Sequence, residues 1–485
     1  MSSDTGAMLD LGGFDQTIAA IENGGRVRLG GAPGTTLTVA NNYLGNAGSI
    51  VELNAALGDD SSITDLLYVQ GDTSGASSLI VNNVGGVGGQ TGEAGIKVID
   101  VEGASDGSFS LLGDYVFEGE QAVVGGAFAY RLYQGTETVA DGDWYLRSEL
   151  DNSLLFQAGV PVYEAYPGVL QSFNQLGTLQ QRLGNRSWTV VAQGADAISE
   201  DAAVSPGIGI WGQIEGGHGE FQPETSTTAT DYDVSIWRLK AGVDTVLSEA
   251  ASGQLIGGLA VQYGTASSDV SSIFGNGSID ATGYGATGTL TWYGNTGFYA
   301  DAQAQVIGYD SDLFSDTAGI GLVEGNGGVG YSLGVELGQR IPVTPEWAVT
   351  PQAQLAWSSV EFDDFTDAFG AAVSLNSGDS LIGRLGLAVD RQTEWQDTDG
   401  SARRAHIYGV GNLYYDFENG SSVDVAGTPV ASENEALWGG LGLGGTYSWA
   451  DDKYAVYGEA LAKSSFDDFG DSYAISGTVG FRASW

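Results

Sequence analysis

The sequence ends in DSYAISGTVGFRASW, residues 471–485, where apolar and polar side chains alternate with a period of two. The residues of one face are large and apolar: Tyr473, Ile475, Val479, Phe481 and Trp485. The residues of the other face are polar: Ser476, Thr478, Arg482 and Ser484. Successive side chains of a β-strand point to opposite faces, so this segment predicts a strand between an apolar and a polar environment.

The same alternation recurs through residues 207–485 and predicts twelve strands. They cover about residues 207–217, 232–247, 253–266, 280–293, 297–309, 328–341, 346–360, 380–395, 402–417, 434–449, 453–466 and 473–485. Short connections alternate with longer ones, except that the last outer connection, 467–472, is also brief. Long strands, short turns at one end and long loops at the other are typical of a transmembrane β-barrel.

A soluble β-sandwich or propeller is the alternative for this half of the chain. Soluble strands average about five or six residues, and the predicted strands are about twice as long. Aromatic residues also lie near the predicted strand ends, as they do in membrane barrels: Trp292, Trp347, Trp357, Trp438, Trp449 and Trp485. We therefore predict an antiparallel transmembrane barrel.

Residues 161–186, PVYEAYPGVLQSFNQLGTLQQRLGNR, interrupt the strand pattern. Apolar residues follow the spacing of one helix face: Leu170, Phe173, Leu176, Leu179 and Leu183. Polar residues fill the rest: Gln171, Asn174, Gln175, Thr178, Gln181 and Arg182. We predict one helix over about 168–183, with Pro167 in its first turn and Gly184 at its end. Its length of roughly 24 Å matches the apolar band of a membrane barrel, about 25 Å.

The first part of the chain, residues 1–155, contains short β-branched runs separated by Gly, Asn and Asp. They lie at residues 36–39, 50–53, 66–69, 78–81 and 96–99. Such regular spacing predicts the coils of a β-solenoid, although a β-sandwich would give a similar pattern. Residues 134–143 are expected to form a hairpin loop between two aromatic strands. The chain therefore divides into residues 1–155, a linker over 156–206, and the barrel over 207–485.

Composition excludes several classes of function. The formal net charge is −44, which opposes binding to nucleic-acid phosphates. There is no Cys, so thiolate metal sites, disulfides and Cys nucleophiles are excluded. No run of about 18 apolar residues predicts a transmembrane helix. The first 15 residues do not have the pattern of a signal peptide, so we expect that an exported protein would begin upstream.

Catalytic chemistry finds no support in the sequence, and we predict no enzyme, cofactor or metal. The two histidines are His218, expected in an outer loop, and His406. Two acidic clusters could bind Ca²⁺, but they lack EF-hand spacing and are interpreted as solvated loops. They are Asp310, Asp312 and Asp316, and Glu361, Asp363, Asp364 and Asp367. From strand parity, Arg384, Arg403 and Arg482 are expected to face the lumen or its rim and contact the helix.

These segments together resemble the autotransporter family of Gram-negative bacteria (type V secretion). Residues 161–186 are similar to the family's linker helix. Residues 211–213 and 479–485 are similar to its first and last barrel strands. Residues 129–148 are similar to the end of a pertactin-like passenger, whose junction region aids passenger folding.

The resemblance implies a twelve-stranded barrel with the helix inside its pore. It also implies insertion into outer-membrane lipid by the barrel-assembly machinery, with periplasmic chaperones as partners. The assembly signal would be Tyr473, Ile475, Val479, Phe481 and Trp485. The pore residues would be Leu170, Phe173, Asn174, Gln175, Leu176, Leu179, Gln181, Arg182 and Leu183. No Asn-Asn pair is present in the linker, so self-cleavage in the pore is not expected.

The function implied by this resemblance is export and display of the amino-terminal passenger at the cell surface by a monomeric outer-membrane barrel. Two alternatives remain: a surface adhesin for which the barrel is only the anchor, and a porin-like channel. The sequence identifies neither a ligand of the passenger nor whether the passenger is released.

Overall fold

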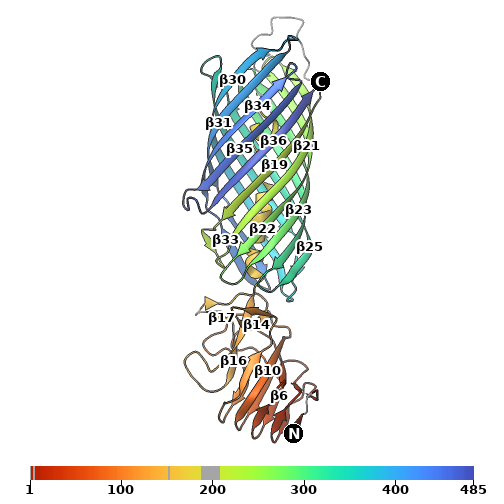
Figure 1. Ribbon diagram of the computed structural model, residues 1–485, viewed down its shortest axis with the longest axis vertical. Helices are drawn as coiled ribbons and strands as arrows, with labels where there is room; N and C mark the ends of the chain where they lie inside the picture. Colours follow the sequence, from red (N-terminus) through yellow and green to blue (C-terminus); the bar gives the residue numbers. More distant parts are fainter. Residues whose placement is uncertain (1, 4–5, 151–152, 187–207) are drawn as a thin grey trace.

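The computed structural model describes residues 2–3, 6–150, 153–186 and 208–485. A tall barrel occupies one half of the molecule, and a narrower stack of short strands extends from one of its ends (Figure 1). The amino terminus lies at the far end of the strand stack, and the carboxyl terminus lies at the opposite end of the barrel. Helical turns are visible inside the barrel, between the two.

The strand stack is a β-solenoid, as predicted. Its parallel strands are β1 (Ser2–Ser3), β2 (Met8–Asp10), β3 (Gln16–Ile18), β4 (Ile21–Asn23), β5 (Arg26–Arg28), β6 (Thr36–Val39), β7 (Tyr43–Gly45), β8 (Ile50–Ala55), β9 (Leu66–Val69), β10 (Thr73–Asn83), β11 (Ile96–Val101) and β12 (Ser108–Leu111). Strands of successive coils pair in parallel, so equivalent residues stack. Leu37 pairs with Leu67, and Leu67 pairs with Ile99, all completely buried.

Antiparallel hairpins close the solenoid at the barrel end. They comprise β13 (Tyr115–Phe117), β14 (Glu120–Gly125), β15 (Phe128–Gln134) and β16 (Trp144–Arg147), followed by the short pair β17 (Glu149–Leu150) and β18 (Ser153–Leu154). The predicted loop over residues 134–143 joins β15 to β16, which confirms the hairpin. β16 also pairs antiparallel with the solenoid strand β11, so the hairpins continue the solenoid sheet.

Within residues 208–485, twelve antiparallel strands form a closed barrel, as predicted. They are β19 (Gly209–Phe221), β21 (Asp231–Ala250), β22 (Gly253–Ser271), β23 (Gly277–Gly294), β24 (Phe298–Ser315), β25 (Ile320–Gln339), β27 (Trp347–Phe362), β30 (Asp379–Gln396), β31 (Ala402–Asp416), β34 (Leu437–Trp449), β35 (Tyr454–Ser465) and β36 (Tyr473–Ser484). The first strand pairs with the last, and β25 pairs with β27, so the sheet has no free edge apart from the short β26 (Ile341–Pro342).

The two faces of the barrel wall invert the usual arrangement of a soluble protein. Outward-facing Leu441 and Leu443 are 75% and 74% exposed. Inward-facing Gln303 and Arg482 are 8% and 4% exposed. A closed barrel with an apolar outer band and a polar interior satisfies every backbone group in lipid, which is the condition for spanning a bilayer with strands.

The long connections at the solenoid end carry structure that the sequence did not predict. Five short strands form a second sheet there: β20 (Thr225–Ser226), β28 (Phe365–Thr366), β29 (Ala372–Ser377), β32 (Gly420–Val425) and β33 (Thr428–Glu433). A further correction concerns His218, which lies within β19 and not in an outer loop. Barrel strands extend beyond the apolar band, and the alternation in Gly-rich 215–219 was too weak to reveal this.

The predicted single helix over about 168–183 was wrong. The structure has α1 (Val160–Asn174) and a short α2 (Leu179–Leu183), with an extended residue, Gln175, after α1. The start was missed because residues 160–167 are buried on all sides and show no polar face. Neither described helix has the length and continuous apolar character to cross a bilayer.

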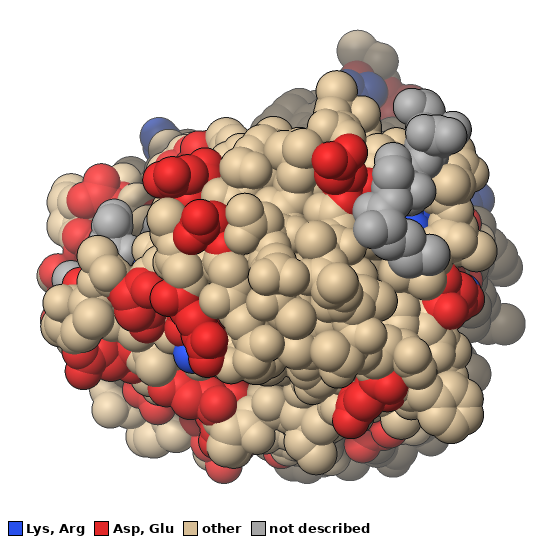
Figure 2. Space-filling model, turned by 90° about the horizontal axis from the view of Figure 1, so that it is seen from below, with Lys and Arg blue, Asp and Glu red and all other residues tan. Residues whose placement is uncertain are grey.

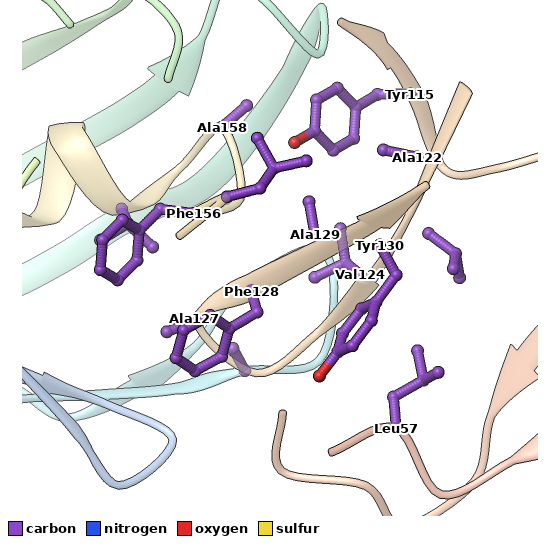
Figure 3. Packing of buried hydrophobic residues seen from close by; sticks show 14 of the residues in the cluster. Leu57, Tyr115, Ala122, Val124, Ala127, Phe128, Ala129, Tyr130, Phe156 and Ala158 are labelled. Atoms are coloured by element: carbon purple, nitrogen blue, oxygen red, sulfur yellow. The ribbon is translucent and has the colours of Figure 1, made fainter. Parts of the chain in front are cut away.

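One hydrophobic core joins the solenoid, the linker and the outer loops. Figure 3 shows Leu57 of the solenoid, Tyr115, Phe128 and Tyr130 of the hairpins, and Phe156 before the linker helix. The same cluster continues to the outer loops at Phe274, Ala371, Val373, Val423, Val425 and Val430. The strand stack is therefore packed on the barrel end and is not merely tethered to it.

Candidate functional site

The linker occupies the lumen of the barrel. α1 contacts the wall strands β21, β22, β23, β24, β25 and β27, and α2 contacts β35 and β36. α1 therefore leans on one side of the wall near the solenoid end. α2 lies nearer the carboxyl terminus of the barrel, at the end where β19 begins.

Two carboxylates hold the start of α1 against the outer loops. Glu164 accepts hydrogen bonds from the backbone N–H groups of Thr227 (2.8 Å) and Thr228 (3.0 Å). Asp367 accepts hydrogen bonds from the Gln157 amide (2.9 Å) and the Tyr163 hydroxyl (2.7 Å). Both carboxylates are buried, and each hydrogen bond to a charged group is stronger than a neutral one.

Apolar contacts continue this attachment along α1. The ring of Tyr166 packs on Phe362 with centroids 4.6 Å apart, and Phe173 packs on Tyr309 at 5.7 Å. Leu170 and Phe173, both predicted to lie on the apolar face, are buried here. This section of the linker thus behaves as part of a core.

α1 ends where polar groups of the barrel wall donate hydrogen bonds to its last carbonyl oxygens. Arg238 donates to the carbonyls of Phe173 (2.9 Å) and Gln175 (3.2 Å). Ser332 and Gln305 donate to the carbonyl of Asn174, at 2.8 Å and 3.1 Å. These are the carbonyls that a continuous helix would use internally. The wall therefore stabilises the interruption, which explains why the helical pattern of the sequence gave no sign of it.

The Asn174 side chain lies completely buried against the wall. Its amide donates to the backbone carbonyls of Tyr331 (3.0 Å) and Ser359 (3.1 Å), which belong to β25 and β27. With its carbonyl bonded to β24 and β25, this one residue is attached to three strands. The sequence placed Asn174 on the polar face of the linker but could not identify these partners.

α2 is fixed by charges and by its own cap. Thr178 and Gln181 form a capping box, and the Gln181 amide also donates to Glu459 at 2.8 Å. Arg182 forms a buried ion pair with Asp301 at 2.5 Å. Each cation in a low-dielectric interior needs such a partner, since an unpaired buried charge is costly.

The linker end contacts the barrel's last strand. Arg482 of β36 donates to the carbonyl of Leu183 at 3.1 Å, and Arg186 pairs with Asp244 at 2.7 Å. Arg482 therefore contacts the linker, as strand parity predicted. Arg384 faces the lumen but pairs with Glu336 of the wall (3.3 Å), and Arg403 lies at the rim beside Asp397.

The remaining predicted pore residues divide between packing and open space. Leu179 and Leu183 join a second apolar cluster with Trp211, Ile256, Tyr293 and Tyr299. Gln175 and Leu176 border a cavity of about 180 Å³, which residues of β19, β35 and β36 also line. Gln213, Lys240, Lys463 and Thr478 also line it. The polar lining is suited to water, so the linker narrows the lumen without filling it.

Several wall residues of this site were missed by the sequence analysis: Arg238, Gln305, Ser332 and Glu336. Their signal was present, because inward-facing polar residues at alternate positions identify a lumen face. What the alternation cannot give is which of them touch the linker, since that depends on the register of two segments far apart in the chain.

The described residues contain no group of three or more His, Asp or Glu side chains able to hold a metal ion. His218 is half exposed, with its Nδ1 3.0 Å from Ser235 Oγ on the outer surface of the barrel. His406 is buried beside Asp390 inside the wall. The geometry thus describes a plugged channel.

The terminal strand presents its predicted apolar residues to the outside. Ile475, Val479, Phe481 and Trp485 are all exposed. The Tyr473 hydroxyl donates to Glu220 at 2.8 Å on the neighbouring strand β19. A lipid-facing row of this kind is available to bilayer or to an insertion factor, whereas Thr478 and Arg482 face inward.

The solenoid end of the molecule is strongly acidic. Seen from that end, acidic side chains are scattered over the surface and basic ones are few (Figure 2). The surface therefore repels polyanions at neutral pH.

Comparison with known proteins gives two matching family models. Residues 210–460 match the model described as Autotransporter beta-domain, which covers more than half of the chain. Residues 23–132 match the model described as Autochaperone Domain Type 1.

Three relatives illustrate the similarity. The Adhesin BmaC autotransporter of Brucella suis biovar 1 (strain 1330) is 51% identical over 93% of this chain. The Autotransporter adhesin AIDA-I of Escherichia coli is 31% identical over 77%. The Pertactin autotransporter of Bordetella parapertussis (strain 12822 / ATCC BAA-587 / NCTC 13253) is 28% identical over 49%. The chain covers 14%, 28% and 24% of these relatives, respectively.

Proposed function

This chain belongs to the autotransporter family, and from that premise we propose that it exports the polypeptide preceding its barrel and then holds the last part of it at the cell surface. The barrel lies in the outer membrane, and the solenoid lies outside. In this proposal, residues 1–155 are the end of the passenger, 156–206 the linker and 207–485 the translocator.

One observation carries the proposal: a single chain runs from the solenoid through the lumen of a closed barrel. α1 begins beside the outer loops, and Leu183 ends α2 beside Arg482 near the opposite rim. A strand stack that had folded first could not pass a lumen already narrowed by one linker. The passenger therefore crosses unfolded and folds outside, and folding opposes its return because buried strands do not slide back.

Display at the surface is favoured over release into the medium. Phe156 packs edge-on against Phe274 of an outer loop, with centroids 5.3 Å apart, and Tyr115 packs against Phe369 at 5.9 Å. Burial of aromatic surface of this kind holds the passenger end to the barrel. Because two relatives are named adhesins, the displayed passenger is proposed to serve adhesion, with the barrel as its anchor.

A porin-like role is the weaker candidate. The linker is attached to the wall by buried ion pairs and by the hydrogen bonds of Asn174, so the lumen is not a free pore. No enzymatic step is proposed. The partners are outer-membrane lipid, periplasmic chaperones and the barrel-assembly machinery. The assembly machinery would bind the exposed row Ile475, Val479, Phe481 and Trp485 of a monomer.

The test is protease treatment of intact cells, followed by gel mobility of the membrane fraction with and without heating. We expect a protease on the outside to remove residues preceding the linker while leaving a barrel whose mobility changes on heating. A product in the soluble fraction with heat-insensitive mobility would contradict both the barrel insertion and the export role.

A further inference from the structure

The linker passes close to the barrel wall at three inward-facing positions that have no side chain. Inward-facing Gly283 of β23 and Gly330 and Gly334 of β25 lie opposite Phe173, Asn174 and Leu176. A Cβ atom on Gly283 would be 2.5 Å from Cε1 of Phe173. On Gly330 it would be 2.9 Å from Cγ of Asn174, and on Gly334 it would be 2.8 Å from Cδ1 of Leu176. All three distances are too short for carbon atoms, so alanine at any of these positions would force the facing side chain to move. At Gly330 the added Cβ would also meet the Tyr309 hydroxyl of the wall, at 2.6 Å.

Polar side chains flank these glycines and bind the backbone carbonyls of Phe173, Asn174 and Gln175. Arg238 takes the carbonyls of Phe173 and Gln175, and Ser332 and Gln305 take the carbonyl of Asn174. We call Gly283, Gly330, Gly334, Arg238, Gln305 and Ser332 together the docking wall. It combines shallow notches, which accept side chains, with donors placed at the carboxyl end of α1, where that helix exposes its carbonyls.

This arrangement matches only one register of the linker. A helix that moved by one residue would rise about 1.5 Å and turn by about 100°. Phe173 would then leave the notch at Gly283, and Arg238, Ser332 and Gln305 would lose their acceptors. Leaving these buried donors unsatisfied costs free energy in addition to the lost packing. Beside the docked linker lies the cavity lined by Gln213 and Lys463, which Arg238 and Gln305 of the docking wall also border.

We propose that the docking wall is the stop of the translocator: it captures the linker at Phe173 and Asn174 and fixes the depth at which the chain comes to rest. The claim that the docking wall stops an outward movement of the chain rests on the proposed export function. Docking of the linker on the wall, by contrast, is a property of the folded protein.

The buried arginines of the linker give a direct measure of docking. Arg182 and Arg186 are 7% and 8% exposed, so trypsin should cleave after them only when the linker leaves the wall. In the purified full chain in detergent, Gly283→Ala should accelerate this cleavage by about tenfold or more, since cleavage follows the population of the open form. The matched control is Gly288→Ala on the same strand, whose Cβ would have only Leu259 within 4 Å, at 3.9 Å. It should cleave like the wild type.

A second pair of variants separates docking from general damage to the barrel. In a Phe173→Ala background the notch is empty, so adding Gly283→Ala should change cleavage by less than about twofold. An unchanged, full effect of Gly283→Ala in that background would overturn the proposal, as would wild-type protection of the single variant. If Gly283→Ala does not yield a heat-modifiable barrel, Gly334→Ala with and without Leu176→Ala provides the same comparison.

Failure of docking and failure of export give different results. If the export proposal is wrong, the wild-type passenger will be inaccessible to protease on intact cells. If only the stop is wrong, the wild-type passenger will be displayed, but the glycine variants will remain as resistant to trypsin as the wild type.

Discussion

The guanidinium of Arg182 on the linker lies 2.5 Å from the carboxylate of Asp301 on the barrel wall, and both side chains are buried. Removing one partner of such a pair leaves an uncompensated charge in the interior. Asp301→Asn should therefore destabilise the docked linker by about 3–5 kcal/mol. Urea unfolding followed by tryptophan fluorescence would measure the loss.

The control for Asp301 is the exposed pair of Arg391 and Glu346, with side chains 45% and 54% accessible. Solvent screens this pair, so Glu346→Gln should change stability by less than about 1 kcal/mol. Equal shifts in the two variants would show that the buried pair does not hold the linker.

The outer face of the barrel should reject charge. Leu443 lies near the middle of β34 and is 74% exposed on the outward face. Leu443→Arg should cost about 2–4 kcal/mol for folding into lipid vesicles, because the guanidinium would enter the bilayer. Ile63→Arg, at a solenoid position that is 64% exposed, should stay within about 0.5 kcal/mol of the wild type. Similar costs at both sites would contradict the assignment of Leu443 to lipid.

The contact of Phe274 with Phe156 should hold the passenger end on the barrel. Truncating a buried aromatic residue removes about 3–5 kcal/mol, so Phe274→Ala should lower the thermal stability of the solenoid while the barrel stays folded. Thermal unfolding followed by circular dichroism at two heating rates would record the transitions of the solenoid and of the barrel.

Ile273 is the neighbouring control for Phe274, because its side chain is 61% exposed. Ile273→Ala should leave the solenoid transition unchanged. A solenoid that melts at the wild-type temperature in Phe274→Ala would mean that the outer loops do not stabilise it.

An alkaline loss of stability should trace to Lys97 in the solenoid. Partial burial opposes the charge of Lys97, but the hydrogen bond and the charge of Asp143, 2.5 Å away, outweigh burial and raise the pKa of the ammonium group above 10.5. The folded state therefore binds the proton of the Lys97 ammonium group more tightly than the unfolded state does. The contribution is complete below pH 10.5 and fades as the pH rises through the elevated pKa.

The measurement compares the urea midpoint of the solenoid between pH 9 and pH 11.5, roughly the window in which lysine loses its proton. At pH 9 the Lys97→Met variant should be less stable than the wild type. Between pH 9 and pH 11.5 its urea midpoint should fall by less than that of the wild type. An identical decline in the two proteins would assign the alkaline effect to other groups.

The sequence predicted the barrel well because alternation is a local property. Val479 is apolar and Arg482 is charged, and they belong to the two alternating sets of positions along the last strand. The structure places Val479 on the outside of the barrel and Arg482 on the inside. The β-solenoid was predicted from the sequence equally well, since runs such as Thr36–Val39 recur at intervals that match the length of one coil. Both predictions need only the order of residues along a few turns or strands.

The linker was harder for a physical reason. Its interruption after Asn174 comes from Arg238, Gln305 and Ser332, which lie more than sixty residues away and belong to three strands. Helical spacing continues across the gap through Leu176 and Leu179, so periodicity alone favours one helix. The start at Val160 was hidden for the opposite reason, because full burial removes the polar face on which the periodicity depends.

The core that runs from Leu57 through Phe156 to Val425 has a mechanical consequence. A force applied to the distal solenoid, as when a cell is dragged from a surface, is delivered to the outer loops and shared among several barrel strands. The force must break this broad contact before it reaches the linker inside the lumen. Unfolding under force should therefore begin in the solenoid coils and leave the plugged barrel intact.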